Sequence, residues 1–268
     1  MHLIFIRHGD PDYAVDSVTP KGRQEAALVG ERIARIKVSA IYVSPMGRAQ
    51  DTAAACLEKL QQAGQNPPCT TIPDFREFSY PIKDPATGKT RIAWDWLPRV
   101  HFSHRKWHDI RRFYTTKAMR SGHIKAHYLS VCRSFDDILA SHGYTRVVPT
   151  LASPAIPIYR CKPHLSDDEA AVDTHLGVVQ RELDEATLVF VCHLGVMFVM
   201  LSHLTAVSPV QLWQSFFVAP SSVTIANAEE RVPGEVAFRL QCVGDTAHLT
   251  GRGEVVSASG FFGNCLSV

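Results

Sequence analysis

Short apolar runs alternate with amphipathic segments at the start of the chain. Residues 2–6 (HLIFI) are apolar and β-favouring and end abruptly in Arg7-His8-Gly9, which predicts a buried strand with polar residues at its carboxyl end. Thr19-Pro20 predicts an N-cap and a first-turn proline at the start of a helix. A second strand is expected over Ala40–Val43, and a second helix from Gly47 to about Gln62.

The same pattern returns near the C-terminus. Thr187–Cys192 predicts a strand, and a helix is expected over Val196–Leu204. Ser222–Ala226 and Val236–Gln241 predict two further strands, separated by a turn at Pro233-Gly234. Strands that alternate with helices favour an α/β fold, here a mostly parallel sheet flanked by helices.

The middle of the chain lacks this alternation. Residues 97–142 look helical, and the Pro-rich stretch that opens 151–185 is typical of a loop or hairpin. We therefore predict an α/β core made of residues 1–78 and 186–268. Residues 79–185 are predicted to be an insertion, a largely helical cap followed by a hairpin region.

Composition limits the classes of partner. The net charge of +2 gives no argument for nucleic acid, but Arg99 to Lys125 hold eight Lys or Arg and a single acid. That basic stretch, around Arg105, Lys106, Arg111 and Arg112, could steer an anionic substrate towards the site. It could instead be a solvated helix face or contact a second subunit, so a homodimer is a possible state of the protein. The absence of any apolar run of about 20 residues predicts no membrane span.

Cysteine usage indicates a reducing compartment. The seven cysteines are an odd number, widely spaced and without a C-x-x-C pair, so reduced thiols are expected. We expect a cytoplasmic protein.

Three predicted strands end in residues that can bind an anion. The first ends in Arg7-His8-Gly9, the second in Ser44-Pro45 with Arg48 in the following helical turn, and the third in His193-Leu194-Gly195. Ligands of open α/β sheets bind at the carboxyl ends of the strands, and helix N-termini and arginine forks both favour phosphate. Each motif alone could be a surface loop, but their shared position predicts one anion site.

The motifs resemble those of the histidine phosphatase superfamily, in its phosphoglycerate-mutase-like branch. The resemblance is carried by Arg7-His8-Gly9, by the run from Ser44 to Ala53, by Arg76-Glu77-Phe78 and by the late run from Val191 to Val196, in the order typical of that family. It covers residues 1–78 and 186–250. It implies no cofactor and no metal.

The resemblance implies a role for each site residue. His8 would attack phosphorus and form a phosphohistidine, which requires a neutral imidazole. Arg7, Arg48, His193 and the backbone N–H of Leu194 would hold the phosphate oxygens. Many relatives have glycine where this chain has Leu194, but the backbone N–H is retained.

Glu77 matches the acid/base position of the family and would protonate the leaving oxygen. It could instead be a surface residue paired with Arg76, and Asp74 and Asp84 are nearby alternative acids. Mutase-type relatives continue after Arg-His-Gly with a polar stretch that ends in Asn. Here Asp10 to Ala14 follow, so no fourth phosphate contact is assigned and hydrolysis is favoured over mutase activity.

The sequence thus predicts a phosphomonoesterase that acts on a small phosphorylated metabolite. A phosphomutase, or a non-catalytic anion-binding or scaffold protein, remains the alternative. In the insertion, His101, His104 and His108 share a helical face that could bind zinc or form a cap surface. The aromatic residues there could pack a cap on the core or stack on a base; they are Trp94, Trp96, Trp107, Phe113 and Tyr114. Ser221 and Ser222 could lie at the rim of the site or simply begin a strand.

Overall fold

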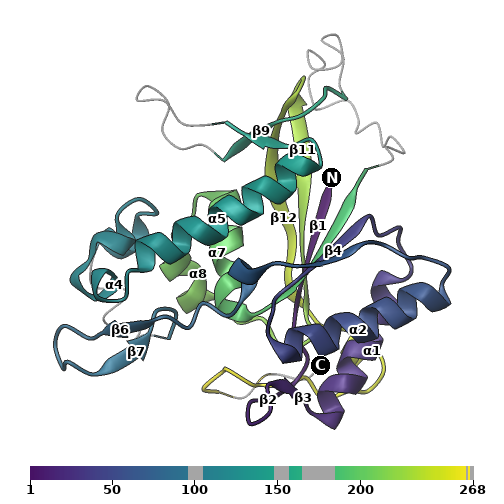
Figure 1. The fold of residues 1–268 in the computed structure, drawn as a ribbon, viewed down its shortest axis with the longest axis horizontal. Helices are drawn as coiled ribbons and strands as arrows, with labels where there is room; N and C mark the ends of the chain where they lie inside the picture. The colour runs from purple at the N-terminus through teal and green to yellow at the C-terminus, as the bar shows by residue number, and fades with distance from the viewer. Residues whose placement is uncertain (96–104, 148–156, 165–184, 264, 266–268) are drawn as a thin grey trace.

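The computed structural model describes residues 1–95, 105–147, 157–164, 185–263 and 265. An eight-stranded sheet crosses the molecule, and helices cover both of its faces (Figure 1). The strands of this sheet are β1 (His2–Arg7), β4 (Ala40–Val43), β5 (Cys69–Thr71), β8 (Thr145–Arg146), β9 (Ile158–Arg160), β10 (Thr187–Cys192), β11 (Val223–Val232) and β12 (Glu235–Asp245).

Two hairpins and a set of helices complete the described residues. The hairpins are β2 (Pro11–Asp12) with β3 (Ser17–Val18), and β6 (Pro81–Lys83) with β7 (Thr90–Ile92). The α-helices are α1 (Pro20–Ile33), α2 (Gly47–Gln62), α4 (Lys117–Ser121), α5 (Ile124–Ser141), α7 (Leu194–Thr205), α8 (Pro209–Ser215) and α9 (Ala247–Thr250). Short 3₁₀ turns cover Pro73–Phe75, Arg105–His108 and Phe113–Thr115.

The sheet is mixed, in the order β5-β4-β10-β1-β11-β12-β9-β8. Strands β5, β4, β10 and β1 pair in parallel, and the remaining pairs are antiparallel. The predicted α/β fold, a sheet flanked by helices, is confirmed. Arg7 pairs with Cys192 and Val43 pairs with Val191, so β1, β4 and β10 end at the same edge of the sheet.

The central strands are buried on both faces, as the unbroken apolar run of β1 predicts. Leu3 and Phe5 join a hydrophobic cluster with residues of α5, α7 and α8, whereas Ile4 and Ile6 join a second cluster with residues of α1 and α2. Alternate side chains of one strand therefore bind two different layers of helices to the sheet.

Several element boundaries follow the sequence closely. β4, β10 and α2 begin and end where predicted, and the Thr19 side chain caps α1 by accepting a hydrogen bond from the Gly22 N–H at 3.0 Å. Helix α7 begins two residues before the predicted start, at Leu194, because His193 takes the extended N-cap conformation. β12 continues to Asp245, beyond the predicted Gln241.

The middle of the chain is joined to the sheet. Strands β8 and β9 extend its antiparallel edge, and buried residues of α5 share a hydrophobic cluster with Phe5 and Phe190. Trp107 and Phe113 are buried in that same cluster, as expected for a cap packed on the core. The division into a core and a 79–185 insertion stays a prediction, and Trp96, His101 and His104 lie outside the described residues.

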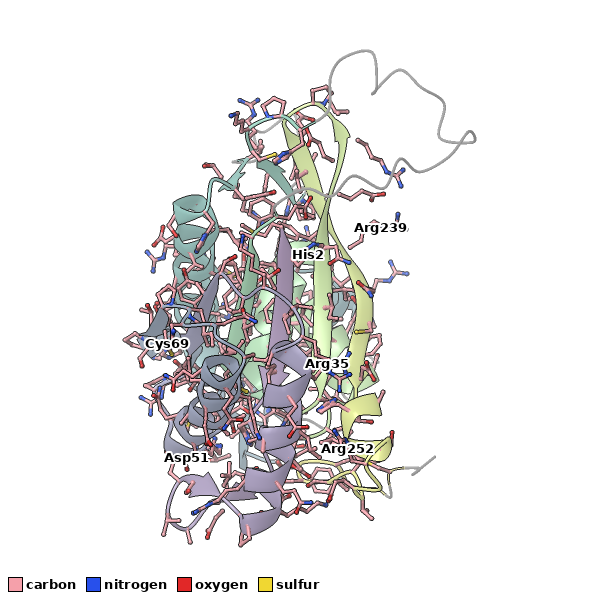
Figure 2. All side chains as sticks on the ribbon, turned by 90° about the vertical axis from the view of Figure 1, so that its right-hand side faces the viewer. His2, Arg35, Asp51, Cys69, Arg239 and Arg252 are labelled. Carbon is pink, nitrogen blue, oxygen red and sulfur yellow. The ribbon has the colours of Figure 1, made fainter. Side chains whose placement is uncertain are left out.

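The C-terminal segment packs along α1. Arg32 donates a hydrogen bond to the Asp245 carboxylate at 2.6 Å, and Arg252 lies 3.3 Å from that of Glu31. Figure 2 shows Arg35 and Arg252 on the same face of the molecule. No helix in the described part of the chain is both long and apolar enough to cross a membrane.

Glu25 of α1 is a buried carboxylate under the loop that follows His8. Its Oε2 accepts a hydrogen bond from the Asp10 N–H at 2.9 Å, and Lys21 Nζ lies 3.8 Å from Oε1. Burial is the largest cause that raises the pKa of Glu25 from 4.5 to about 7. Ionisation of Glu25 therefore lowers the free energy of unfolding progressively as the pH rises from about 4.5 through about 7.

We predict that Glu25→Gln raises the free energy of unfolding at pH 8 by about 2 kcal/mol, because the buried charge is removed. Below pH 4.5 both forms of the protein carry a neutral group, so the difference should shrink towards zero. Urea denaturation at the two pH values measures it. An equal change at both pH values would contradict the assignment of the buried charge.

Candidate active site

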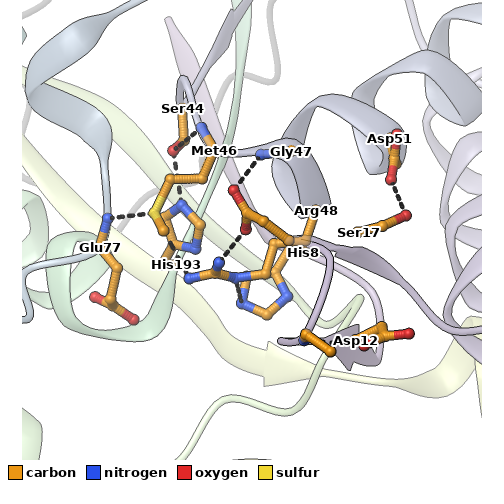
Figure 3. Close-up of polar contacts among 12 residues, drawn as sticks. His8, Asp12, Ser17, Ser44, Met46, Gly47, Arg48, Asp51, Glu77 and His193 are labelled. Atoms are coloured by element: carbon orange, nitrogen blue, oxygen red, sulfur yellow. Dashed lines mark hydrogen bonds and ion pairs between the residues drawn. The ribbon is translucent and has the colours of Figure 1, made fainter.

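The strand ends bring the imidazoles of His8 and His193 and the guanidinium of Arg48 into one place (Figure 3). The charge of Arg7 acts on both rings and helps to lower their pKa. The rings of His8 and His193 have centroids 5.0 Å apart, and Arg48 Nε donates a hydrogen bond to His8 Nε2 at 3.3 Å. Arg7 directly precedes His8 on β1. All four side chains are buried, none more than 6% exposed. The structure thus brings His8, Arg48 and His193 together, as the strand ends predict, and their catalytic and binding roles stay predictions.

The contacts of His8 fix its tautomer. Nδ1 lies 2.8 Å from the Gly9 carbonyl oxygen, which can only accept, so Nδ1 carries the proton and Nε2 presents its lone pair to the site. Burial, helped by the charges of Arg7 and Arg48, holds the pKa of His8 well below its usual value. The Nε2 lone pair, which here accepts from Arg48 Nε, makes this neutral imidazole a candidate nucleophile.

Gly9 allows the loop after His8 to pass close to the backbone of α1. A Cβ at this position would lie 2.5 Å from the Gly22 carbonyl oxygen, so only glycine fits without displacing α1. The Gly9 N–H donates to Thr52 Oγ1 at 3.0 Å, which ties the loop to α2. Helices α1 and α2 together hold the backbone next to His8 in place.

Ser44 orients His193. Ser44 Oγ lies 2.6 Å from His193 Nε2 and accepts a hydrogen bond from the Met46 N–H at 3.3 Å (Figure 3). The hydroxyl can donate its hydrogen to Nε2 or accept one from it, so this contact orients the ring in either neutral tautomer. His193 Nδ1 is buried and has no hydrogen-bond partner. Burial is the largest cause that holds the pKa of His193 well below its usual value.

Arg48 is held by the β2–β3 loop. Its guanidinium forms a short ion pair with Asp16, and the second Asp16 oxygen accepts from the Gly47 N–H at 2.9 Å. Asp16 has a φ of 50°, in the left-handed region that aspartate tolerates better than most residues. The ring of Tyr13 lies over the same guanidinium, with its centroid 5.4 Å from Arg48 Cζ.

Arg7 is held from the C-terminal side of the chain. Its terminal nitrogens donate to the carbonyl oxygens of Val218 at 2.7 Å and of Ser259 at 2.8 Å. The guanidinium carbon lies 5.7 Å from the centroid of the Phe217 ring. The buried Nε has no hydrogen-bond partner. This arrangement fixes the arginine and leaves N–H groups available for an anion.

Glu77 lies at the same site, beside the first turn of α7. Its Oε1 accepts a hydrogen bond from the Phe78 N–H at 2.7 Å. Burial raises the pKa of Glu77, while the Phe78 N–H and the charges of Arg7 and Arg48 act against that rise. A carboxyl group with a raised pKa keeps its proton to a higher pH than a free glutamate does, which suits a general acid.

The alternative acids have structural roles. Asp74 accepts hydrogen bonds from Ser130 and Ser134 of α5, at 2.9 and 2.6 Å. Asp84 accepts from the Ala86 N–H in the β6–β7 turn at 2.9 Å. Each carboxylate stabilises a local contact, so Glu77 remains the candidate acid.

The N-terminus of α7 faces this group of side chains. Leu194 and Gly195 occupy its first two positions, where backbone N–H groups have no acceptor within the helix. A Cβ on Gly195 would lie 2.5 Å from Glu77 Oε1 and 2.5 Å from Trp94 Cδ1. Glycine is therefore required here for Glu77 and Trp94 to approach the helix.

Ser221 and Ser222 support the backbone of β1. The Ser221 N–H donates to the carbonyl oxygens of Arg7 at 2.9 Å and of His8 at 3.1 Å. The Ser221 carbonyl in turn lies 2.9 Å from His248 Nε2. Both serines directly precede β11, as the strand-start interpretation expects, and a place at the rim of the site stays a prediction.

One group of possible metal ligands occurs among the described residues. Ligand atoms of Cys161, His164 and Glu230 all lie within 4.8 Å of one another. This group lies next to β9 and the β11–β12 turn, at the end of the sheet opposite His8 (Figure 1). Of the predicted histidine trio only His108 is described.

Three contributors to the site were not identified from the sequence: Asp16, Thr52 and Tyr13. Asp16 and Tyr13 belong to an irregular loop, and only their closeness to Arg7-His8-Gly9 in the chain could have indicated them. Thr52 lies four residues after Arg48, on the same face of α2, which is a helical-spacing signal that could have been used. Ser44 was noted as a strand end, but not as the partner of His193.

Part of the chain matches a known protein family by sequence. Residues 3–109 match the sequence model of the histidine phosphatase superfamily (branch 1). No curated protein matches the chain. The superfamily resemblance inferred from the motifs is confirmed by this match.

Solved structures share the fold at low identity. "Mycobacterial hydrolase 1" has a TM-score of 0.54 and 15% identity, over 92% of this chain and 99% of that one. A phosphoserine phosphatase mutant from Entamoeba histolytica, in complex with phosphoserine, has a TM-score of 0.52 and 17% identity, over 92% and 98%. The mycobacterial glucosyl-3-phosphoglycerate phosphatase complexed with VO3 has a TM-score of 0.53 and 16% identity, over 91% and 99%.

We predict that Ser44→Ala lowers the affinity for inorganic phosphate about tenfold, because His193 loses the contact that orients its ring. Isothermal titration with phosphate measures the change, and Ser44→Thr should restore most of the affinity. Ser202→Ala, which also removes a buried hydroxyl, is the matched control. Unchanged phosphate affinity in Ser44→Ala would rule out this role for the serine.

Proposed function

We propose that this chain, whose residues 3–109 match the histidine phosphatase superfamily, is a phosphomonoesterase that acts through a phosphohistidine on a small phosphorylated metabolite. One observation carries the proposal. The neutral His8 ring accepts from Arg48 Nε at Nε2, lies beside the His193 ring and feels the charge of Arg7, and all four side chains are buried. Such a site can bind a tetrahedral dianion and can also attack it.

Donors around His8 would hold the phosphoryl group. Arg48, Arg7 and the Nδ1–H of His193 supply charge or hydrogen bonds, and the Leu194 N–H adds the positive end of α7. The charge of the phosphoryl oxygens shifts as the ester bond breaks, and fixed donors stabilise it without reorganisation. Supported by Asp16, Ser44 and backbone carbonyls, these donors are already in place in the free protein.

The reaction would take two steps. In the first, His8 Nε2 attacks phosphorus, the P–O ester bond breaks, and protonated Glu77 gives its proton to the leaving oxygen. In the second, ionised Glu77 takes a proton from water, the water oxygen attacks phosphorus, and the N–P bond breaks. Inorganic phosphate leaves, and His8 and Glu77 return to their starting states.

Each alternative function has its own signature. A phosphomutase would move phosphate between two positions of one substrate without net phosphate release. A non-catalytic anion-binding protein would be stabilised by phosphate yet show no turnover over a broad panel of phosphomonoesters. Both experiments use the intact chain.

We predict that His8→Ala abolishes turnover of p-nitrophenyl phosphate, a reduction of at least 10⁴-fold. In the wild-type protein, rapid quenching during turnover should trap acid-labile phosphate on His8, which mass spectrometry under mildly alkaline conditions locates. His203→Ala, which changes a histidine bound to Asp136 away from the site, is the control. Wild-type turnover by His8→Ala would refute the proposed nucleophile.

We predict that Glu77→Gln lowers kcat for alkyl phosphates by about 10²- to 10⁴-fold, because an alkoxide leaving group needs a proton. With p-nitrophenyl phosphate the first step needs less help, so phosphohistidine should accumulate. In the wild type, kcat should fall as the pH rises through the raised pKa of Glu77. This decline, the basic limb of the pH–rate profile, should be absent in Glu77→Gln.

Asp74→Asn provides the control for Glu77, since Asp74 is the neighbouring acid that bonds to α5. It should keep both the turnover and the basic limb. If Asp74→Asn rather than Glu77→Gln removed that limb, Glu77 would not be the acid.

A further inference from the structure

Trp94 contributes an unused hydrogen-bond donor to the site. Its indole Nε1 is buried and has no hydrogen-bond partner. An indole N–H can only donate, and a buried donor left unpaired costs about 1–3 kcal/mol. Buried polar atoms of this kind are uncommon in folded proteins and call for an explanation.

The position of that donor is next to the candidate acid. A Cβ built on Gly195 would lie 2.9 Å from Trp94 Nε1 and 2.5 Å from Glu77 Oε1. Trp94 Nε1 and Glu77 Oε1 therefore both lie against the first turn of α7, close to where the phosphoryl group would bind. Trp94 comes from the segment after β7, whereas Glu77 belongs to one of the family motifs.

The surroundings hold Trp94 in place. Its carbonyl oxygen accepts a hydrogen bond from Gln214 Nε2 at 3.2 Å, and its ring packs against the larger hydrophobic cluster. The Ala93 N–H, one residue earlier, donates to the Tyr80 carbonyl at 3.1 Å. The indole N–H is thus fixed before any ligand arrives, which is the arrangement that favours specific recognition.

We infer that Trp94 is a substrate-recognition residue whose indole N–H donates a hydrogen bond to an oxygen on the leaving group of the phosphomonoester. The inference rests on the proposed function, in which Glu77 protonates the ester oxygen. In that reaction, a donor fixed beside Glu77 would lie close to the atoms attached to the ester oxygen. The preferred substrate therefore carries a hydroxyl or carboxylate oxygen on the carbon next to the ester carbon.

Three small esters test this inference. Ethyl phosphate has no such oxygen, 2-hydroxyethyl phosphate has a hydroxyl, and carboxymethyl phosphate has a carboxylate. The measured quantity is the ratio of kcat/KM for each oxygen-bearing ester to that for ethyl phosphate. In Trp94→Phe at least one ratio should fall about tenfold, the effect of one lost hydrogen bond. The ester whose ratio falls identifies the acceptor.

Trp213→Phe is the matched control. The Trp213 indole N–H donates to the Gly195 carbonyl at 3.0 Å, so this donor is satisfied within the protein. Trp213→Phe should lower Tm and leave the substrate ratios unchanged. Trp94→Phe should lower Tm less, since the donor that it removes has no partner in the free protein.

Failure of the inference can be separated from failure of the proposed function. Dissociation constants of the three esters, measured by titration on His8→Ala, report recognition without turnover. For each oxygen-bearing ester, the ratio of its dissociation constant to that of ethyl phosphate is compared between His8→Ala and the double variant that also carries Trp94→Phe. If neither ratio changed, recognition of the substrate by Trp94 would be excluded. A shift of the basic pH limb in Trp94→Phe with unchanged ratios would also overturn it, because the indole would then act on Glu77 and not on substrate. Absence of wild-type turnover alone would contradict only the proposed function.

Discussion

The site depends on keeping two guanidinium groups and two neutral imidazoles together in a buried space. Like charges repel one another there, and burial penalises every protonated form. The pKa of both His8 and His193 is held well below its usual value by burial, with further lowering by Arg7 and Arg48. The same field that keeps the nucleophile neutral would attract a phosphate dianion, so one arrangement of charge serves both purposes.

The supports for these charges come from distant parts of the chain and are largely fixed acceptors. Asp16 compensates Arg48 from the β2–β3 loop, and the carbonyls of Val218 and Ser259 hold Arg7. Ser44 holds His193 from the end of β4. Carbonyls and a hydroxyl restrain position without cancelling charge, so Arg7 keeps its full attraction for an anion, whereas Arg48 shares its charge with an aspartate.

The sequence predicted the core of the fold and of the site, because both depend on local signals. Apolar runs and end residues define β4, α2 and β10. Arg7 ends β1, His193 directly follows β10, and Arg48 lies in the first turn of the helix after β4. Asp16 and Ser259 could not be predicted, because their contacts depend on a left-handed loop residue and on a backbone carbonyl in an irregular segment. Trp94 was noted only as one of several aromatic residues, since its place beside Glu77 arises from tertiary packing.

The contact between Arg7 and Ser259 joins residues 252 positions apart. During synthesis, β1 and His8 are made long before the carbonyl that fixes the Arg7 guanidinium. Until residue 259 has been added, Arg7 has only part of its support, and before β10 and β11 are made, β1 lacks both of its neighbouring strands. The arrangement of charge around His8 therefore forms late in folding, after distant parts of the chain have come together.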